Sequence, residues 1–421
     1  MENRLTALDF TSNISRLTEN FMGRQWIFDE IDRWLKESEQ RFFILTGEPG
    51  VGKSAIAAHL IQTRTDIVAH HFCQLGNEET VHPSRVLRSL AAQLLNQTQD
   101  FPYYGDALLN TIKSTLSTEI DIKIEKIEDL ISRTKSKVKR VEINHVNTSD
   151  IANELDILIR APLAALPALY KKYEKEPPEL AIILIDGLDI AVTLEAGVQE
   201  DEDLATLFAS LSEDESLPSW IRFIFTTRPD RRVLREFEPL KPYLIDERSE
   251  KNLADIRQYV NWRMSLPTLQ QQVTKTKIEA QEWIEQLTQR SQGNFRYIKS
   301  LLDELEIGIC SLNALPALPQ DLVNSYDNDF AQRFPVSEWS NRHDLILKTL
   351  AEAEHPLTED ELVTLTKMRP RELRQDLWGL RQFLDVDLVG DKLEDQHETF
   401  TIFHHSLKEY LTRRSPPVTI S

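Results

Sequence analysis

The octapeptide GEPGVGKS at residues 47–54 constrains this chain more than any other feature of its sequence. It matches the pattern GxxxxGK[ST], in which glycines let backbone N–H groups surround phosphate oxygens at the start of a helix. The apolar run RFFILT precedes the motif at residues 41–46, and an alanine- and leucine-rich segment follows it at residues 54–63. This order of strand, glycine loop and helix predicts a phosphate-binding loop at the opening of an α/β unit.

Three further apolar segments predict the other strands of the same sheet. Residues 67–75, 181–185 and 221–226 are short and apolar, as expected for strands that are buried on both faces. Helices are predicted at residues 26–35 and, after Pro83, at residues 84–95. Together these elements predict the P-loop NTPase fold class, a parallel sheet with helices on both faces.

Side chains with the chemistry of a nucleotide site follow the loop and end the neighbouring strands. Lys53 is expected to neutralise β- and γ-phosphate charge, and the Ser54 hydroxyl to bind Mg²⁺. Asp186 ends an apolar run and is the expected acid on the metal side, while Asp189 could orient or deprotonate an attacking water. Arg228 could contact the γ-phosphate with its guanidinium. Simpler interpretations are a capped loop for the two aspartates and an exposed turn residue for the arginine.

After about residue 245 the strand signals almost vanish, and helices are predicted at residues 251–264, 277–290 and 295–306. The pattern then changes again. Three further helices are predicted. The first spans residues 341–353, the second begins at a capping box formed by Thr358 and Glu361, and the third spans residues 372–384. Two strands are predicted around Gly390-Asp391, and three helices followed by a hairpin indicate a winged helix.

These patterns divide the chain into four expected parts. They are a leader or short helix at residues 1–20, a P-loop nucleotide-binding domain at 21–245, an all-α domain at 246–335 and a winged-helix domain at 336–421. The nucleotide-binding domain carries an insertion at about 103–160. Within it, residues 120–131 fit either a strand or a helix, and the basic run at 133–140 is interpreted as a charged face.

Composition limits the partners and the compartment. The formal net charge of −19 disfavours attraction of the whole surface to nucleic acid or to anionic lipid. Cys73 and Cys310 are the only cysteines and have no metal-ligand spacing, so a reducing cytoplasm is expected. The N-terminus lacks the apolar core of a signal peptide, and the longest apolar run is too short to cross a bilayer.

Several short motifs together resemble the STAND class of signal-transduction ATPases, particularly its bacterial NACHT and NB-ARC-like members. The resemblance extends from about residue 21 to 413. FMGR at 21–24 is similar to the N-terminal "hhGR" motif that lies against the base, GEPGVGKS to Walker A, LIDGLD at 184–189 to Walker B and TTRP at 226–229 to the sensor arginine. SQGNF at 291–295 and LPQDL at 318–322 resemble parts of the helical lid domain, and FHHSLKEYL at 403–411 the end of the winged helix.

The resemblance implies a molecular switch that binds ADP in a closed resting state, exchanges it for ATP on activation and is reset by slow ATP hydrolysis. His404, rather than His405, is the implied contact to the β-phosphate. Expected partners are ATP or ADP with Mg²⁺, other copies of this chain on activation, and an effector or sensor protein. The residues expected to bind the nucleotide are Gly23, Arg24, Gly47, Glu48, Pro49, Gly50, Val51, Gly52, Lys53, Ser54, Ala55, Arg228 and His404.

Two departures and two alternatives accompany this interpretation. Ile190 stands where NACHT proteins often have a glutamate, so hydrolysis could be slower or built differently. A C-terminal array of sensor repeats, usual in the class, is not seen before residue 421. The first alternative is a P-loop kinase acting on a small molecule. The second is a DNA-binding regulator that uses the winged helix, although the charge of residues 371–385 is nearly balanced.

Overall fold

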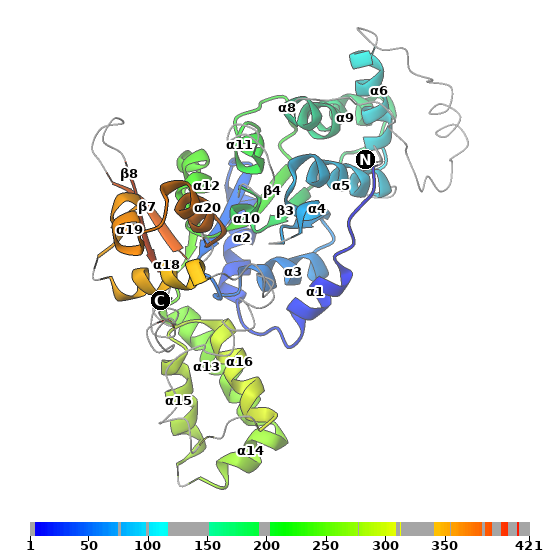
Figure 1. Cartoon of the computed structure of the whole chain (residues 1–421). Helices are drawn as coiled ribbons and strands as arrows, with labels where there is room; N and C mark the ends of the chain where they lie inside the picture. The colour runs from blue at the N-terminus through cyan, green and yellow to red at the C-terminus, as the bar shows by residue number, and fades with distance from the viewer. Residues whose placement is uncertain are drawn as a thin grey trace. The chain divides into compact units, whose positions relative to one another are not determined.

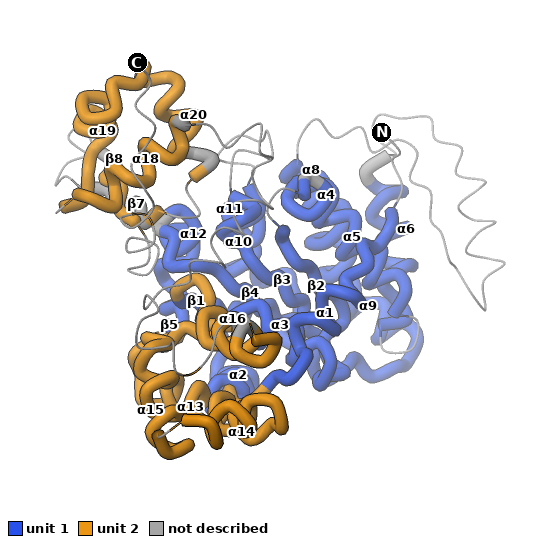
Figure 2. Tube along the Cα trace, turned by 60° about the horizontal axis from the view of Figure 1, so that its bottom comes forward, with its two compact units in different colours: residues 1–21, 25–47, 53–244 blue, residues 22–24, 48–52, 245–421 orange. Residues whose placement is uncertain are grey.

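The computed structural model describes residues 5–74, 77–97, 101–116, 151–192, 203–276, 278–308, 312, 341–353, 355–380, 384–389, 397–402 and 411. The chain divides into two compact units (Figure 2). Unit 1 comprises residues 1–21, 25–47 and 53–244. Unit 2 comprises residues 22–24, 48–52 and 245–421. Each unit is described by itself below.

A five-stranded sheet has the order β2-β3-β4-β1-β5. Its strands are β1 (Phe42–Gly47), β2 (Ile67–Phe72), β3 (Ala181–Asp186), β4 (Ile221–Thr227) and β5 (Tyr243–Ile245). The pairs β2–β3, β3–β4 and β4–β1 are parallel. The first four strands are confirmed where the apolar runs predict them, and β5 was not predicted. Because the register pairs Phe72 with Asp186 and Thr46 with Thr227, the carboxyl ends of these strands meet at one edge of the sheet.

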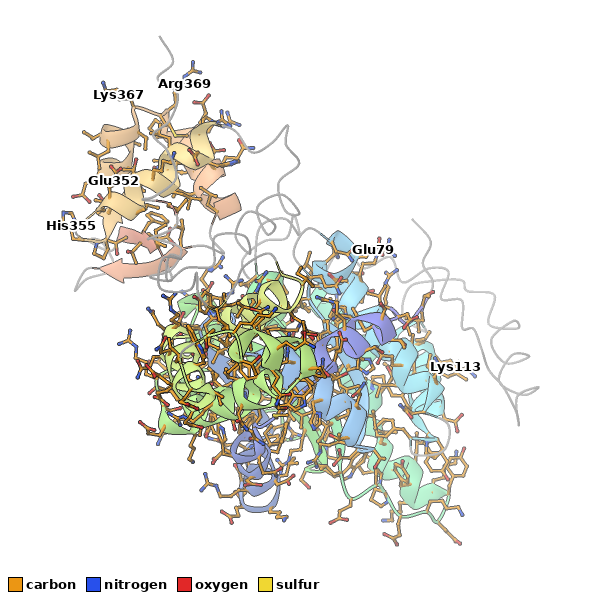
Figure 3. All side chains as sticks on the ribbon, turned by 90° about the horizontal axis from the view of Figure 1, so that it is seen from below. Glu79, Lys113, Glu352, His355, Lys367 and Arg369 are labelled. Carbon is orange, nitrogen blue, oxygen red and sulfur yellow. The ribbon has the colours of Figure 1, made fainter. Side chains whose placement is uncertain are left out.

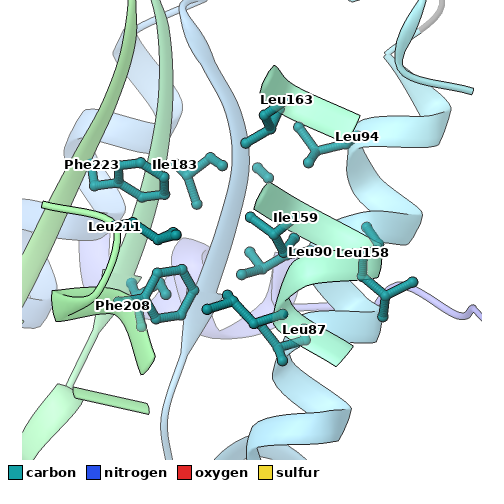
Figure 4. Packing of buried hydrophobic residues seen from close by; sticks show 14 of the residues in the cluster. Leu87, Leu90, Leu94, Leu158, Ile159, Leu163, Ile183, Phe208, Leu211 and Phe223 are labelled. Carbon is teal, nitrogen blue, oxygen red and sulfur yellow. The ribbon is translucent and has the colours of Figure 1, made fainter. Parts of the chain in front are cut away.

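Helices cover both faces of this sheet, as predicted (Figure 1). Alternate residues of a strand point to opposite faces. One set, including Ile183 and Phe223, packs in a cluster with α5 (Pro83–Asn96), η1 (Asp156–Arg160), α9 (Ala161–Lys172) and α11 (Leu204–Ala209) (Figure 4). On the opposite face lie α2 (Gln25–Glu37) and α3 (Lys53–Thr63), where the rings of Trp34 and Phe43 are 5.4 Å apart.

Residues 1–20 contain the short helix that was one of the two expectations for this segment. The helix α1 (Thr11–Thr18) lies against α3. The ring of Phe10, just before it, packs edge-on against His71 at 5.1 Å, and the backbone N–H of Leu8 donates to the Ser89 hydroxyl at 3.0 Å. These contacts integrate the segment into unit 1.

The described ends of the expected insertion are helical. α6 (Tyr104–Leu116) and α8 (Ile151–Leu155) pack near α5 and α9. The buried Tyr104 hydroxyl donates to the carbonyl of Leu158, and Arg88 of α5 pairs with the buried Glu154. Residues 120–131, for which strand and helix were both open, and the basic run at 133–140 lie outside the described residues. Unit 1 also contains α4 (Glu78–Val81), α10 (Leu188–Ala191), α12 (Arg231–Glu236) and η4 (Glu238–Leu240).

Helices follow β5 in unit 2, as predicted. They are α13 (Glu250–Met264), α14 (Pro267–Val273), α15 (Ala280–Arg290) and α16 (Phe295–Glu306). α14 was not predicted, and α15 starts later than expected. Side-chain caps begin two of the helices: the Ser249 hydroxyl accepts from the N–H of Asn252, and Asn294 Oδ1 accepts from the N–H of Tyr297 at 3.0 Å.

Gly293 precedes the cap of α16 at a position where only glycine fits. Its φ is +88°, and an added Cβ would lie 2.1 Å from the carbonyl oxygen of Glu247. Gly308, after the same helix, also has a positive φ of +80° but has open space around the Cβ position. We expect Gly308→Ala to lower the free energy of unfolding by about 1 kcal/mol and Gly293→Ala by about 3 kcal/mol, because only the latter adds a backbone clash. Urea unfolding of both variants measures the difference, and equal losses would contradict it.

The C-terminal part of unit 2 combines three helices and a small sheet. Its elements are α18 (Asn341–Glu352), β6 (Leu357–Thr358), α19 (Glu359–Thr366), α20 (Pro370–Leu380), β7 (Leu384–Val389) and β8 (His397–Ile402). The sheet is antiparallel in the order β6-β8-β7. The side chains of Glu352, His355, Lys367 and Arg369 are exposed on this part (Figure 3).

Two predictions for this part are confirmed and one is wrong. The capping box is present, since the Thr358 hydroxyl accepts from the N–H of Glu361 and the Glu361 carboxylate accepts in return. The two strands around residue 390 are also present. The helix predicted at residues 372–384, however, runs from 370 to 380, and Leu384 belongs to β7, where it pairs with Ile402. Alternation in LDVDLV favours a strand from that residue on.

Within the part of the chain that the structure describes, no helix is long and apolar enough to cross a membrane.

Candidate nucleotide-binding site

The phosphate-binding loop connects a buried strand to a helix, as its sequence predicts. β1 is buried along its whole length and ends at Gly47, and α3 begins at Lys53. Residues 48–52 between them belong to unit 2. Within that unit, Gly50 has φ +83° and an added Cβ would lie 2.4 Å from Asn294 Oδ1. A glycine is therefore required there by both backbone conformation and space.

In unit 1, the carboxyl ends of β3 and β4 bring Asp186 to the first turn of α3. The Thr226 hydroxyl donates to Asp186 Oδ1 at 2.5 Å and accepts from the N–H of Gly187 at 3.0 Å. Burial raises the pKa of Asp186, and hydrogen bonds from Thr226 and Ser54, with the nearby charge of Lys53, oppose that rise. Lys53 Nζ donates to the Gly47 carbonyl at 2.5 Å. The predicted Lys53, Ser54 and Asp186 thus lie together.

Asp189 and Arg228, predicted separately, form a pair. Asp189 lies in α10, just after Gly187, and is 8% exposed. Its Oδ1 accepts from the backbone N–H of Arg228 at 3.0 Å, and its Oδ2 lies 3.2 Å from Arg228 Nε. Both carboxylate oxygens therefore engage the arginine. The sequence predicts that Asp189 could orient or deprotonate an attacking water, which stays a prediction, and the structure adds a contact of its carboxylate with Arg228.

Gly23 and Arg24 lie in unit 2, where the arginine is almost fully buried. Gly23 is next to the Asp255 side chain, and the backbone N–H of Arg24 donates to Asp255 Oδ2 at 3.0 Å. The guanidinium donates to Asn252 Oδ1 at 2.6 Å and to the carbonyl of Val51 at 2.5 Å. The resemblance implies that this motif lies against the base, and the described contacts of the Arg24 side chain include the phosphate-binding loop at Val51.

Several residues of the site were missed by sequence reasoning. Thr226 belongs to the TTRP motif, and its hydroxyl donates to Asp186. Asn294 belongs to SQGNF, and its Nδ2 donates to the carbonyl of Pro49 at 3.0 Å. Asn252 and Asp255 belong to no motif, although both are buried polar residues of α13. His404, His405 and the segment 318–322 lie outside the described residues.

The donor set at this edge of the sheet fits Mg²⁺. One hydroxyl and one buried carboxylate, Ser54 and Asp186, are hydrogen-bonded to each other. Among the described residues, no group of three or more histidine, cysteine, aspartate or glutamate side chains could hold a metal ion. Mg²⁺ typically takes one or two protein oxygens and completes its shell with phosphates and water. The Ser54 hydroxyl and the Asp186 carboxylate therefore suit an Mg²⁺ ion that arrives with a nucleotide.

Comparison with known proteins finds one family model and several similar solved structures. Residues 23–144 match the family described as "Nephrocystin 3, N-terminal". Among solved structures, the chain is similar to a Walker-type ATPase of Pyrococcus abyssi, with 13% identity, a TM-score of 0.42 and coverage of 93% of this chain and 96% of that one. The Aeropyrum pernix ORC1 protein in complex with DNA gives 10% identity, a TM-score of 0.36 and coverage of 97% and 94%.

A signal transduction ATPase with numerous domains (STAND) from Pyrococcus horikoshii, which has a tetratricopeptide repeat sensor, is also similar. It has 12% identity and a TM-score of 0.29, and the match covers 94% of this chain but 43% of that protein. Because the TM-scores of these three structures are below 0.5, the fold is argued from the strand order of the sheet and from the loop between β1 and α3. That evidence places the chain in the P-loop class. The DNA in the ORC1 structure belongs to that protein, and our expectation that nucleic acid is not a partner here stays a prediction.

Proposed function

We propose that this protein binds adenine nucleotide with Mg²⁺ and hydrolyses ATP slowly, as a switch of the STAND type. One observation carries the proposal: a complete Walker A loop leads into α3, and Ser54 in the first turn of that helix is hydrogen-bonded to Asp186 at the end of β3. This is the arrangement that an Mg²⁺-nucleotide requires. The NACHT or NB-ARC subtype is part of the proposal and rests on the motifs.

Each residue has a defined role in the proposed reaction. The loop from Gly47 to Gly52 would surround the β-phosphate with backbone N–H groups, and α3 would present its positive end to the same anion. Lys53 would neutralise phosphate charge, and Ser54 and Asp186 would hold Mg²⁺, which withdraws charge from the phosphates. Arg228 would contact the γ-phosphate. The backbone N–H of Ala55, in the first turn of α3, would also contact the nucleotide.

The proposed domains extend this site into a switch. We assign a P-loop domain to residues 21–245, a helical lid to 246–335 and a winged helix to 336–421. In the resting state His404 of the winged helix would donate a hydrogen bond to the β-phosphate of ADP. ATP would favour a second state, in which the winged helix is released and copies of the chain associate, to the extent that the two states differ in affinity for the two nucleotides. The cytoplasmic location is also a prediction.

Mass spectrometry of the nucleotide released from purified protein tests the switch. We expect ADP in the monomeric wild type, and at least about tenfold faster exchange for added nucleotide in His404→Ala, because one hydrogen bond to a charged group is lost. His405→Ala is the matched control and should exchange at the wild-type rate. Wild-type protein that is empty, stable and indifferent to ADP and ATP would refute the proposal.

The same preparations distinguish the two alternatives. A kinase transfers the γ-phosphoryl group of ATP to an acceptor other than water, so release of free phosphate that needs only water argues against it. For a DNA-binding regulator, α20 would have to offer its basic side chains to the duplex. Arg374 of this helix instead donates to both carboxylate oxygens of Glu359 at 2.7 and 2.8 Å, and Asp376 pairs with Arg342 at 2.9 Å. These contacts favour an intramolecular role for this part of the chain.

A further inference from the structure

Three consecutive carbonyl groups of the phosphate-binding loop are held by donors from elsewhere in unit 2. The carbonyl of Pro49 accepts from Asn294 Nδ2 at 3.0 Å, and the carbonyl of Gly50 accepts from the backbone N–H of Arg296 at 3.1 Å. The carbonyl of Val51 accepts from the Arg24 guanidinium at 2.5 Å. We call these three donors the carbonyl clamp.

The clamp determines where the loop's N–H groups point. In a trans peptide the C=O of one residue and the N–H of the next point in opposite directions, and all peptide bonds of the described residues are trans. With the carbonyls of Pro49 and Val51 directed at the clamp, the N–H groups of Gly50 and Gly52 face the opposite side. A phosphate-binding loop needs N–H groups turned toward the anion, and the clamp provides that orientation for Gly50 and Gly52 before any ligand arrives. The N–H of Val51 instead donates to the carbonyl of Glu48 at 3.3 Å.

Arg24 is the most constrained member of the clamp. Its φ is +69°, an uncommon conformation for a residue other than glycine, and it is 2% exposed. Its charge is balanced by Asp255, with a closest distance of 3.8 Å, and its guanidinium lies 4.3 Å over the centre of the Phe295 ring. Burial lowers the pKa of Arg24 to about 10, so the side chain is still charged at neutral pH.

Asn252 holds the Arg24 guanidinium and is itself held by the backbone. Asn252, which accepts from Arg24, donates through Nδ2 to the carbonyls of Glu247 at 2.6 Å and Gly293 at 2.8 Å. Asn252 is therefore held by the two carbonyl groups that lie just before the start of α13 and of α16. The Arg24 guanidinium therefore has the Phe295 ring over one face, and its N–H groups face Asn252, Asp255 and the carbonyl of Val51.

We propose that Arg24 and Asn294 are positioning residues that hold the phosphate-binding loop in its anion-binding conformation, and that Arg24 does not contact the base. This inference rests on the proposed nucleotide binding. It predicts a selective defect. Losing the clamp should weaken the binding of the β-phosphate, which the loop surrounds, and should leave recognition of the base unchanged.

Two variants remove clamp donors with little other change. Arg24→Met keeps an unbranched side chain without the donors. Asn294→Asp keeps the oxygen that caps α16 but replaces the donor to Pro49 with a carboxylate oxygen. Arg263→Met is the matched control. Arg263 is also an almost buried arginine of unit 2, and its guanidinium contacts Tyr259 at 2.8 Å, Asp303 at 2.8 Å and Glu306 at 2.7 Å, away from residues 48–52.

The experiment is calorimetric titration of full-length, nucleotide-stripped protein with ADP, GDP and AMP. We expect both clamp variants to bind ADP about 10- to 100-fold more weakly, because each loses a buried hydrogen bond that orders the loop. Binding of AMP should change less than about threefold, and the ratio of ADP to GDP affinity should stay at its wild-type value. Arg263→Met should lower the unfolding midpoint without altering any of these affinities.

The outcomes separate this inference from the function on which it rests. If Arg24→Met changes the ratio of ADP to GDP affinity, or weakens AMP as much as ADP, Arg24 contacts the base and the inference is wrong. It is also wrong if the folded variant binds ADP like wild type. If Arg24→Met does not fold, Asn294→Asp alone decides, by the same comparison of ADP with AMP. Wild type that binds none of the three nucleotides refutes the proposed function itself.

Discussion

Lys53→Ala is expected to weaken ADP binding by about 100-fold, the largest single effect on affinity that we predict. Lys53 begins α3 directly after the loop, and its ammonium group lies 2.5 Å from the carbonyl oxygen of Gly47. A charge-assisted hydrogen bond to a bound β-phosphate would replace that neutral contact. Its loss removes both a hydrogen bond and the only lysine charge of the motif, equivalent to about 2.8 kcal/mol.

Calorimetric titration with ADP measures this effect, together with the unfolding midpoint of the nucleotide-free protein. The midpoint should change little, because Lys53 is only half-buried. Lys171→Ala, an exposed lysine in the last turn of α9, is the matched control and should bind ADP like wild type. An ADP affinity of Lys53→Ala within threefold of wild type would mean that the loop does not hold the phosphates.

The parts of the fold that the sequence predicts well are those fixed by local pattern. The apolar runs identify β1 to β4, Pro83 identifies the start of α5, and the Thr358 and Glu361 pair identifies the start of α19. Each of these signals acts within a few residues along the chain. α14 escaped prediction because PTLQQQV has only two apolar residues, and the helix α20 was extended too far because apolar residues continue into β7.

The residues of the candidate site also fall into those that local sequence pattern predicts and those that it does not. Lys53, Ser54 and Asp186 follow strand ends, and parallel strands bring their carboxyl ends to one edge, so their proximity could be predicted. The contacts of Arg24 with Asn252 and Asp255 join residues more than 220 positions apart and depend on how α13 packs. No periodicity or motif encodes such pairs. The contact between Asp189 and Arg228 likewise depends on tertiary geometry.

The second large effect concerns the pair of Asp189 and Arg228. We expect Arg228→Ala to lower the rate of ATP hydrolysis by about 100-fold while ADP affinity stays within threefold, because Arg228 would stabilise charge on the γ-phosphate in the transition state. Arg232→Ala is the control. Arg232 is a nearby arginine, paired with Asp230 at 2.7 Å, and its loss should leave hydrolysis unchanged.

Asp189 should behave as part of the same unit. Its two oxygens engage the backbone N–H and Nε of Arg228, so Asp189→Ala should lower hydrolysis by a similar factor, and the double variant should be little worse than either single one. Asp189→Asn keeps an oxygen that can accept from Arg228 and should retain more activity than Asp189→Ala. A general base would give the opposite pattern, since an amide cannot take a proton from water.

Phosphate release under single-turnover conditions distinguishes these roles for the four variants. If Asp189→Asn is as inactive as Asp189→Ala, and the double variant loses the product of the two single factors, Asp189 acts on the water and its contact with Arg228 is incidental. If the losses coincide and asparagine rescues part of the rate, the carboxylate serves to aim the guanidinium. In that case Asp189 holds Arg228 by its backbone N–H and Nε at the end of β4, and ATP alone brings the γ-phosphate that the guanidinium would contact.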